Sequence, residues 1–229
     1  MAPAQLDGSV LPGGAIPSRR RPAASPVSRV IGADDALPIR ILAISGSLRS
    51  ASSNTQLLLA AARQTPQKAA IELYDGIGGL PHFSPDLDGP DSPAPVVELR
   101  ARIASADALL ISSPEYAHGV PGSLKNALDW LVSGVEIVAL PVALLNASPH
   151  STHAQAALAE TLKTMSAQLV PEASVTIPLT GRGLDASGIL ADPALAGALR
   201  SALETLAGAA RAARASGKRL VGWHPDLAP

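Results

Sequence analysis

The chain has 229 residues, of which 47% are hydrophobic, so it is long enough for one sizeable domain with a buried core. Its formal net charge of −1 argues against a nucleic-acid-binding protein or a protein of anionic membranes, which normally carries a basic excess. The absence of cysteine excludes disulfides, thiolate catalysis and cysteine-based metal or iron–sulfur sites.

The first 37 residues are rich in Pro, Gly, Ala and Ser. We expect residues 1–37 to be a disordered extension and residues 38–229 to form one domain. Three arginines at 19–21 are interpreted as a solvated part of the extension, and the alternative is a targeting or anion-binding patch. The sequence shows no secretion signal and no apolar run of membrane-spanning length, so we expect a cytoplasmic protein that binds no membrane.

Apolar runs of strand length alternate with segments of helical periodicity along the rest of the chain. In chain order we expect a strand at 39–45, a helix at 54–64, a strand at 69–75, a helix at 95–106, a strand at 107–113, a helix at 121–133, a strand starting near Pro141 within 136–148, a helix at 151–168, a strand at 170–179, and a last helix capped by Asp192. This alternation predicts an α/β fold, a flavodoxin-like doubly wound sheet of five parallel strands in three layers.

The stretch GSLRSASSN, residues 46–54, joins the first expected strand to the first helix. In a doubly wound sheet, ligands bind outside the carboxyl ends of the strands. A helix starting near Asn54 or Thr55 would point unpaired N–H groups into this loop, and Arg49 adds a permanent positive charge. The stretch therefore predicts a phosphate site, and the alternative is simple helix capping by Ser and Asn. Neither the Walker A motif nor the three-glycine dinucleotide fingerprint occurs, which favours a mononucleotide.

A second loop, within SSPEYAHGVPGSLKNALDW at residues 112–130, follows the third expected strand at the same edge of the sheet. Pro114 fixes the turn, Gly119 permits close backbone approach, and Tyr116 is one of only two tyrosines. Backbone N–H groups of such a loop suit a flat heterocycle that Tyr116 would line.

The two stretches together resemble the motifs of the NADPH-dependent FMN reductase family, approximately GS-x-R-x-x-S-x-N and PEY-x-x-x-x-PG-x-LKNA-x-DW, and the resemblance covers about residues 39–177. It implies bound FMN and two-electron transfer from NAD(P)H to a small acceptor, such as a quinone, free flavin, azo compound or metal oxyanion. FMN would carry this chemistry, so no catalytic side chain is expected. Charge developing on the reduced flavin would be met by backbone N–H donors of the loops after strands three and four.

The resemblance also assigns residues to the cofactor. The phosphate positions match Ser47, Arg49, Ser53 and Asn54, and the positions bordering the isoalloxazine ring match Pro114, Glu115 and Tyr116. The set of expected cofactor residues is completed by Ser45, Thr55, His118, Gly119 and Ser148. For Glu115 we expect a structural role, because hydride transfer through flavin needs no acid or base there.

One segment departs from the family pattern. NASPHSTHAQ, residues 146–155, has no glycine where the family usually carries a glycine-rich loop against the flavin. Two alternatives to the enzyme therefore stay open, an electron carrier without its own activity and a degenerate member that binds flavin weakly. A metal site built on His118, His150 and His153 lacks a carboxylate or cysteine partner, and no metal is expected.

The helix expected at 121–133 bears one apolar stripe, which consists of Leu124, Ala127, Leu128, Leu131 and Val132. Trp130 lies away from this stripe. An aromatic on the outer face suggests a protein partner, and members of the family form oligomers around this helix, so we expect a homodimer or homotetramer. The alternative is partial burial of Trp130 under a neighbouring loop.

Overall fold

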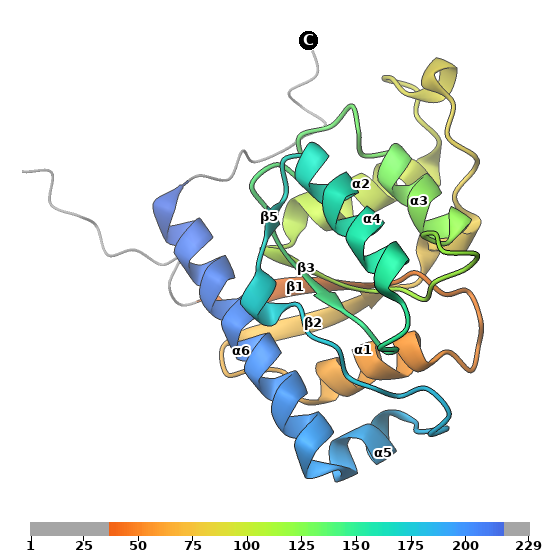
Figure 1. The fold of residues 1–229 in the computed structure, drawn as a ribbon. Helices are drawn as coiled ribbons and strands as arrows, with labels where there is room; N and C mark the ends of the chain where they lie inside the picture. Colours follow the sequence, from red (N-terminus) through yellow and green to blue (C-terminus); the bar gives the residue numbers. More distant parts are fainter. Residues whose placement is uncertain (1–36, 218–229) are drawn as a thin grey trace, which may run out of the picture. The chain divides into compact units, whose positions relative to one another are not determined.

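The structure, a computed structural model, describes residues 37–217. The expected extension, apart from Leu37, and its arginine cluster lie outside the described residues. The sheet has five parallel strands in the order β2-β1-β3-β4-β5 (Figure 1). The strands are β1 (Ile39–Ser45), β2 (Ala69–Tyr74), β3 (Ala108–Ser112), β4 (Pro141–Leu145) and β5 (Gln168–Leu169). The strand order confirms the doubly wound fold, because it places the switch point between β1 and β3.

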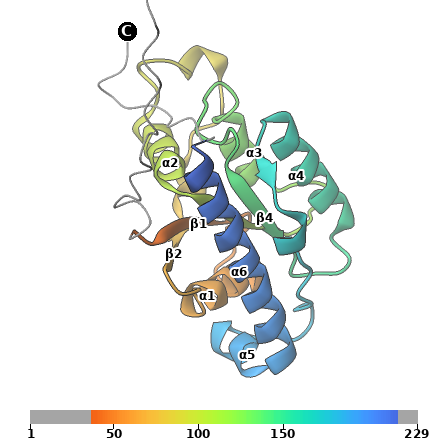
Figure 2. The same ribbon diagram turned by 90° about the vertical axis from the view of Figure 1, so that its left-hand side faces the viewer.

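Helices cover both faces of the sheet, which confirms the three predicted layers (Figures 1 and 2). One face packs against α1 (Ser53–Arg63), α5 (Ala186–Ala191) and α6 (Pro193–Ser216). The other face packs against α2 (Ala94–Ser105), α3 (Gly122–Asp129) and α4 (Thr152–Thr164). Short 3-10 helices occur at Gly76–Gly79, Pro85–Leu87 and Pro171–Ala173. The sequence pattern did not predict α5.

The prediction of a strand over 170–179 is wrong. Pro171 begins a 3-10 helix, and β5 is limited to Gln168–Leu169. The chain then rejoins β4 at an isolated bridge between Asn146 and Thr176. Proline lacks the N–H group that a regular ladder requires, so Pro171 and Pro178 interrupt this edge of the sheet.

The prediction that Trp130 faces a partner protein is also wrong. The α-helix ends at Asp129, and the Trp130 side chain is fully buried within the chain itself. Its indole Nε1 donates to the carbonyl of Pro81 at 2.8 Å, and its ring meets Phe83 edge-on with centroids 5.1 Å apart. The 76–93 loop therefore covers Trp130, which is the alternative reading. Because the helix has ended, Val132 leaves the apolar stripe and is 64% exposed.

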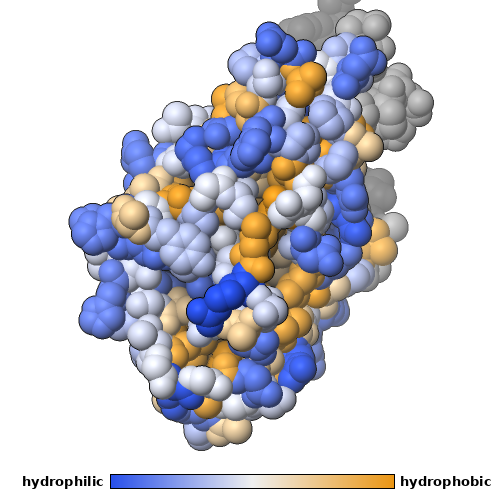
Figure 3. Space-filling view, turned by 90° about the vertical axis from the view of Figure 1, so that its right-hand side faces the viewer, coloured by the Kyte–Doolittle hydropathy of each residue, from blue (hydrophilic) through white to orange (hydrophobic). Residues whose placement is uncertain are grey.

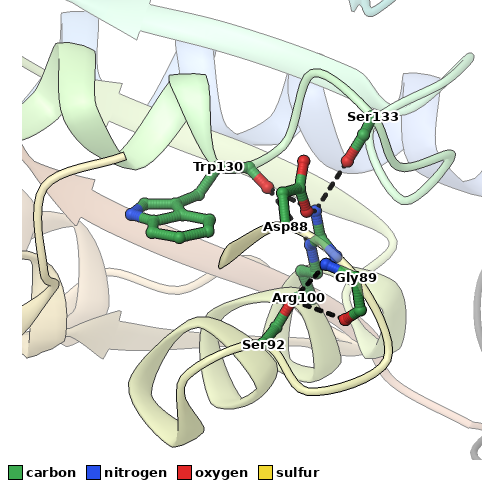
Figure 4. Close-up of polar contacts among 6 residues, drawn as sticks. All are labelled: Asp88, Gly89, Ser92, Arg100, Trp130 and Ser133. Atoms are coloured by element: carbon green, nitrogen blue, oxygen red, sulfur yellow. Dashed lines mark hydrogen bonds and ion pairs between the residues drawn. The ribbon is translucent and has the colours of Figure 1, made fainter. Parts of the chain in front are cut away.

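Arg100 of α2 fastens this loop to the end of α3 (Figure 4). Its Nη2 donates to the backbone carbonyl of Trp130 at 2.7 Å and to the hydroxyl of Ser133 at 2.8 Å. The same nitrogen pairs with Asp88 at 2.7 Å, and both side chains are mostly buried. A guanidinium at this position stabilises the negative end of the helix dipole and satisfies the carbonyl of Trp130, the residue that caps α3.

Asp192 caps α6, as the sequence predicts. Its carboxylate accepts hydrogen bonds from the N–H groups of Ala194 at 3.0 Å and Leu195 at 3.2 Å. Arg182 donates to it at 2.8 Å, and this hydrogen bond is the main cause that lowers the pKa of Asp192 below its usual value. The ionised form is therefore the one that the folded chain stabilises.

We expect Asp192→Ala to lower the melting temperature at neutral pH. A carboxyl with a lowered folded pKa stabilises the fold above its usual pKa, and this contribution is lost as the pH falls through the lowered pKa. Thermal unfolding of Asp192→Ala and of the unchanged protein between neutral pH and about pH 3 measures this effect. The difference between their melting temperatures should shrink toward the acid end. The exposed Asp91→Ala is the matched control, and a difference that grows in acid would contradict the role of Asp192.

Candidate functional site

A cavity of about 320 Å³ lies at the carboxyl ends of β1, β3 and β4, where the strand order predicts a ligand site. Figure 3 faces this edge of the molecule, where hydrophobic residues show at the centre and below it among hydrophilic ones. The walls of the cavity come from the loops after β1, β3 and β4 and from Thr180 and Gly181 of the loop before α5. The volume lies within the range of small-molecule sites, about 300–1,000 Å³.

Hydroxyl groups, an amide and a guanidinium line one end of the cavity, at Ser47, Ser52, Ser53, Asn54 and Arg49. The hydroxyl of Ser52 caps α1 by accepting from the N–H of Thr55, so the first turn of α1 faces the cavity. Arg49 is exposed, and its guanidinium donates to the carbonyl of Ala51 at 2.6 Å. A helix amino terminus, hydroxyl donors and a guanidinium make this end suited to a phosphate group.

Two of the residues expected at the cofactor lie behind this loop instead of in the cavity wall. The hydroxyls of Ser45 and Thr55 are 2.8 Å apart, and Ser45 also accepts from the N–H of Ser47 at 3.3 Å. These bonds hold the loop against the start of α1. Asn54 both lines the cavity and holds the loop in place, because its Oδ1 accepts from the hydroxyl of Ser112 on β3 at 2.9 Å.

The loop after β3 forms a tight hairpin at the other end of the cavity. The N–H and carbonyl groups of Tyr116 and Gly119 bond reciprocally at 3.1 and 2.9 Å. The two central residues, Ala117 and His118, have φ angles of 49° and 60°. Turns of this type favour Gly and Asn, and a left-handed conformation costs other residues about 1–2 kcal/mol each. Pro114, Glu115 and Tyr116 line the cavity, whereas His118 and Gly119 do not.

Two contacts join this hairpin to the start of α4. Glu115 Oε2 accepts from the N–H of Ala154 at 2.8 Å, which is a structural role of the kind expected for this residue. The rings of His118 and His153 stack with centroids 4.3 Å apart and an interplanar angle of 16°. Within residues 37–217, no group of three potential ligands is placed to hold a metal ion.

The glycine-free loop after β4 is held by its own side chains. Buried Asn146 accepts from the N–H of Ser148 at 3.0 Å and donates to the carbonyl of Ser151 at 3.4 Å. The N–H of His150 donates to the hydroxyl of Ser148, and the N–H of Ser151 donates to the backbone carbonyl of Ser148. These N–H groups already donate within the loop. The loop therefore presents the hydroxyls of Ser148 and Ser151 to the cavity more than it presents backbone donors.

Sequence reasoning missed part of the cavity wall, namely Ser113, Ala147, Ser151, Thr180 and Gly181. Ser113 lies inside the second of the two stretches that were singled out. Thr180 and Gly181 follow the last strand-like segment, so the rule that ligands bind at the carboxyl ends of the strands applies to them too.

The sequence of residues 39–181 matches the family model for NADPH-dependent FMN reductases. The chain belongs to this family. An NAD(P)H-dependent FMN reductase of Pseudomonas aeruginosa is 37% identical over 159 residues, which are 67% of this chain and 85% of that protein. A 2-hydroxy-1,4-benzoquinone reductase of a Burkholderia species is 45% identical over 94 residues, which are 41% of this chain and 50% of that protein.

Solved structures agree with this assignment. The flavoenzyme NAD(P)H:(acceptor) oxidoreductase FerB of Paracoccus denitrificans superposes with a TM-score of 0.68 at 27% identity, covering 76% of this chain and 98% of that chain. The apo form of an NADH:FMN oxidoreductase, at 22% identity and a TM-score of 0.57, shares the fold over 83% of this chain and all of that chain. The predicted family, the flavodoxin-like fold and the enzyme class are thereby confirmed.

The cofactor of the family is FMN with NAD(P)H as electron donor, as predicted, and the cavity fits FMN. Donors for a phosphate gather around Arg49 in the loop after β1, and Pro114 with Tyr116 lines the cavity from the loop after β3. Within residues 37–217, each helix is too short or too polar to cross a membrane.

Proposed function

We propose that this protein is an NAD(P)H-dependent FMN enzyme that reduces a small quinone-like acceptor. The observation that carries the proposal is the polarised cavity at the carboxyl ends of the strands, with Arg49 and the start of α1 at one end and Tyr116 at the other. Bound FMN would take up the hydride of NAD(P)H and deliver it to the acceptor. The names of the Burkholderia relative and of FerB support a small acceptor.

The residues of the chain would bind, orient and shield the cofactor. Arg49, Ser47 and Ser53 would hold the phosphate, and Tyr116 with Pro114 would border the ring. The hydroxyl of Ser148 accepts from the N–H of His150, so its own hydrogen is free to point to the cavity. Donors fixed at this place would stabilise charge that develops on the reduced flavin.

An oligomer and a cytoplasmic location are part of the same proposal. Trp130 gives no support to the oligomer, because it is buried within the chain. The exposed valines after α3, Val132 and Val135, are the apolar residues that this region offers to a second copy. The cytoplasmic location is supported by the need for NAD(P)H.

The experiment is a titration of the purified full-length protein, loaded with FMN, under anaerobic conditions. NADPH or NADH should bleach the flavin absorbance, and a quinone should restore it over many turnovers. Flavin that NAD(P)H leaves oxidised would indicate an electron carrier. Protein that cannot be loaded with FMN would indicate the degenerate member that the 146–155 loop suggested. Either result would overturn the proposed enzyme.

A further inference from the structure

We propose that His118 and His153 form a positioning pair, whose ring stack holds Tyr116 in place at the cavity and thereby sets the affinity of the site for NAD(P)H and acceptor. The inference rests on the proposed function for the identity of the ligands. The stack itself is a contact between two elements of this chain and can be tested without them.

The first step is the conformation of the hairpin that carries Tyr116. Ala117 and His118 both occupy the left-handed region, with φ angles of 49° and 60°, and neither is glycine or asparagine. The reciprocal bonds between Tyr116 and Gly119 close the turn but leave it with this backbone strain. Such conformations persist where the surrounding structure holds them.

The second step is the set of contacts that hold the hairpin. Glu115 precedes Tyr116 and bonds to the N–H of Ala154, and His118 follows Tyr116 and stacks on His153. Ala154 and His153 are neighbours in the first turn of α4. The Tyr116 side chain is 55% exposed, so its own packing does little to place it. The contacts on either side of it fix its position instead.

The third step separates positioning from binding. Tyr116 lines the cavity, whereas His118 and His153 do not. The phosphate end around Arg49 is built by a different loop. Loss of the stack should therefore alter the ring end of the site, where NAD(P)H and acceptor react, more than it alters the retention of FMN.

The test compares full-length, FMN-loaded His153→Ala and His153→Phe with the unchanged protein. His153→Ala should raise the KM values for NAD(P)H and acceptor roughly two- to tenfold, the range expected for the loss of one aromatic pair. The FMN dissociation constant and kcat should change less, and the visible circular dichroism of the bound flavin should change. His153→Phe keeps a ring at this position and should restore all of these values. His150→Ala, an exposed histidine of the same segment, is the matched control and should behave as the unchanged protein.

A second measurement uses the protein without FMN. Hydrogen exchange at the N–H groups of Tyr116 and Gly119 should be faster in His153→Ala and normal in His153→Phe. In the background of His118→Gly, which has no ring and adopts the left-handed conformation at position 118 without strain, His153→Ala should have no further effect.

The proposal is overturned if His153→Ala leaves exchange and KM unchanged, if His153→Phe does not restore them, or if the two substitutions act additively. A protein that binds no FMN would overturn the proposed function alone, because the exchange experiment would still report on the stack.

Discussion

Trp130→Ala is expected to lower the free energy of unfolding by about 3–5 kcal/mol. The indole is fully buried, packs edge-on against Phe83 and donates to the carbonyl of Pro81. Its removal leaves a cavity beneath the 76–93 loop and takes one of two donors from the carbonyl of Pro81, which keeps its bond from Asn126. The loop remains linked to α2 through the ion pair of Asp88 and Arg100, so the loss of stability comes from packing more than from this ion pair (Figure 4).

Urea denaturation of the full-length protein measures this effect, and light scattering on the same samples follows the particle mass. Trp130→Phe keeps an aromatic ring and should lose less stability than Trp130→Ala. Asp91→Ala is the matched control at an exposed residue of the same loop, with an expected change within about 0.5 kcal/mol. A smaller particle with normal unfolding energy would restore the discarded view that Trp130 serves a protein partner.

Arg49→Ala is expected to weaken FMN binding by about ten- to a hundredfold, since charge-assisted hydrogen bonds contribute roughly 1.5–3 kcal/mol. Arg49 is the guanidinium of the cavity wall and stands beside the amino terminus of α1. Folding should change little, because the side chain is exposed and its bond to the carbonyl of Ala51 is local.

Fluorescence titration of the apoprotein with FMN gives the dissociation constant. Arg49→Lys keeps the charge but not the forked donor, so its FMN dissociation constant should fall between those of Arg49→Ala and the unchanged protein. Arg211→Ala, an exposed arginine of α6, controls for the loss of one positive charge. Riboflavin, which lacks the phosphate, should bind Arg49→Ala and the unchanged protein alike. Equal FMN affinity of the two proteins would mean that the phosphate lies elsewhere.

The sequence was sufficient for those parts of the fold that depend on local pattern. Continuous apolar runs identified β1, β3 and β4, and a capping aspartate followed by proline located the start of α6. The position of Trp130 was beyond this kind of reasoning. The 76–93 loop that covers it has no periodicity, and its contact through Pro81 and Phe83 joins segments more than forty residues apart.

The candidate site was predictable to the extent that it follows from topology. The strand order brings the loops after β1, β3 and β4 together, so most of the expected cofactor residues line one cavity. The sequence cannot show which way a side chain turns, and Ser45 and Thr55 bond to each other instead of facing the cavity. Nor does it reveal that the ring of His118 lies on His153.

The hydrogen bonds of Asn146 bear on the kinetics of cofactor capture. They complete the loop after β4 without any contribution from a ligand, so the entropy of ordering this wall is lost during folding and not again when FMN arrives. Association with FMN should then be a single diffusive step, whose rate depends on ionic strength through Arg49 and shows no limiting plateau at high FMN concentration. In a newly folded chain this wall of the FMN site would therefore already be ordered, and the cellular supply of FMN would set how quickly the chain becomes a holoenzyme.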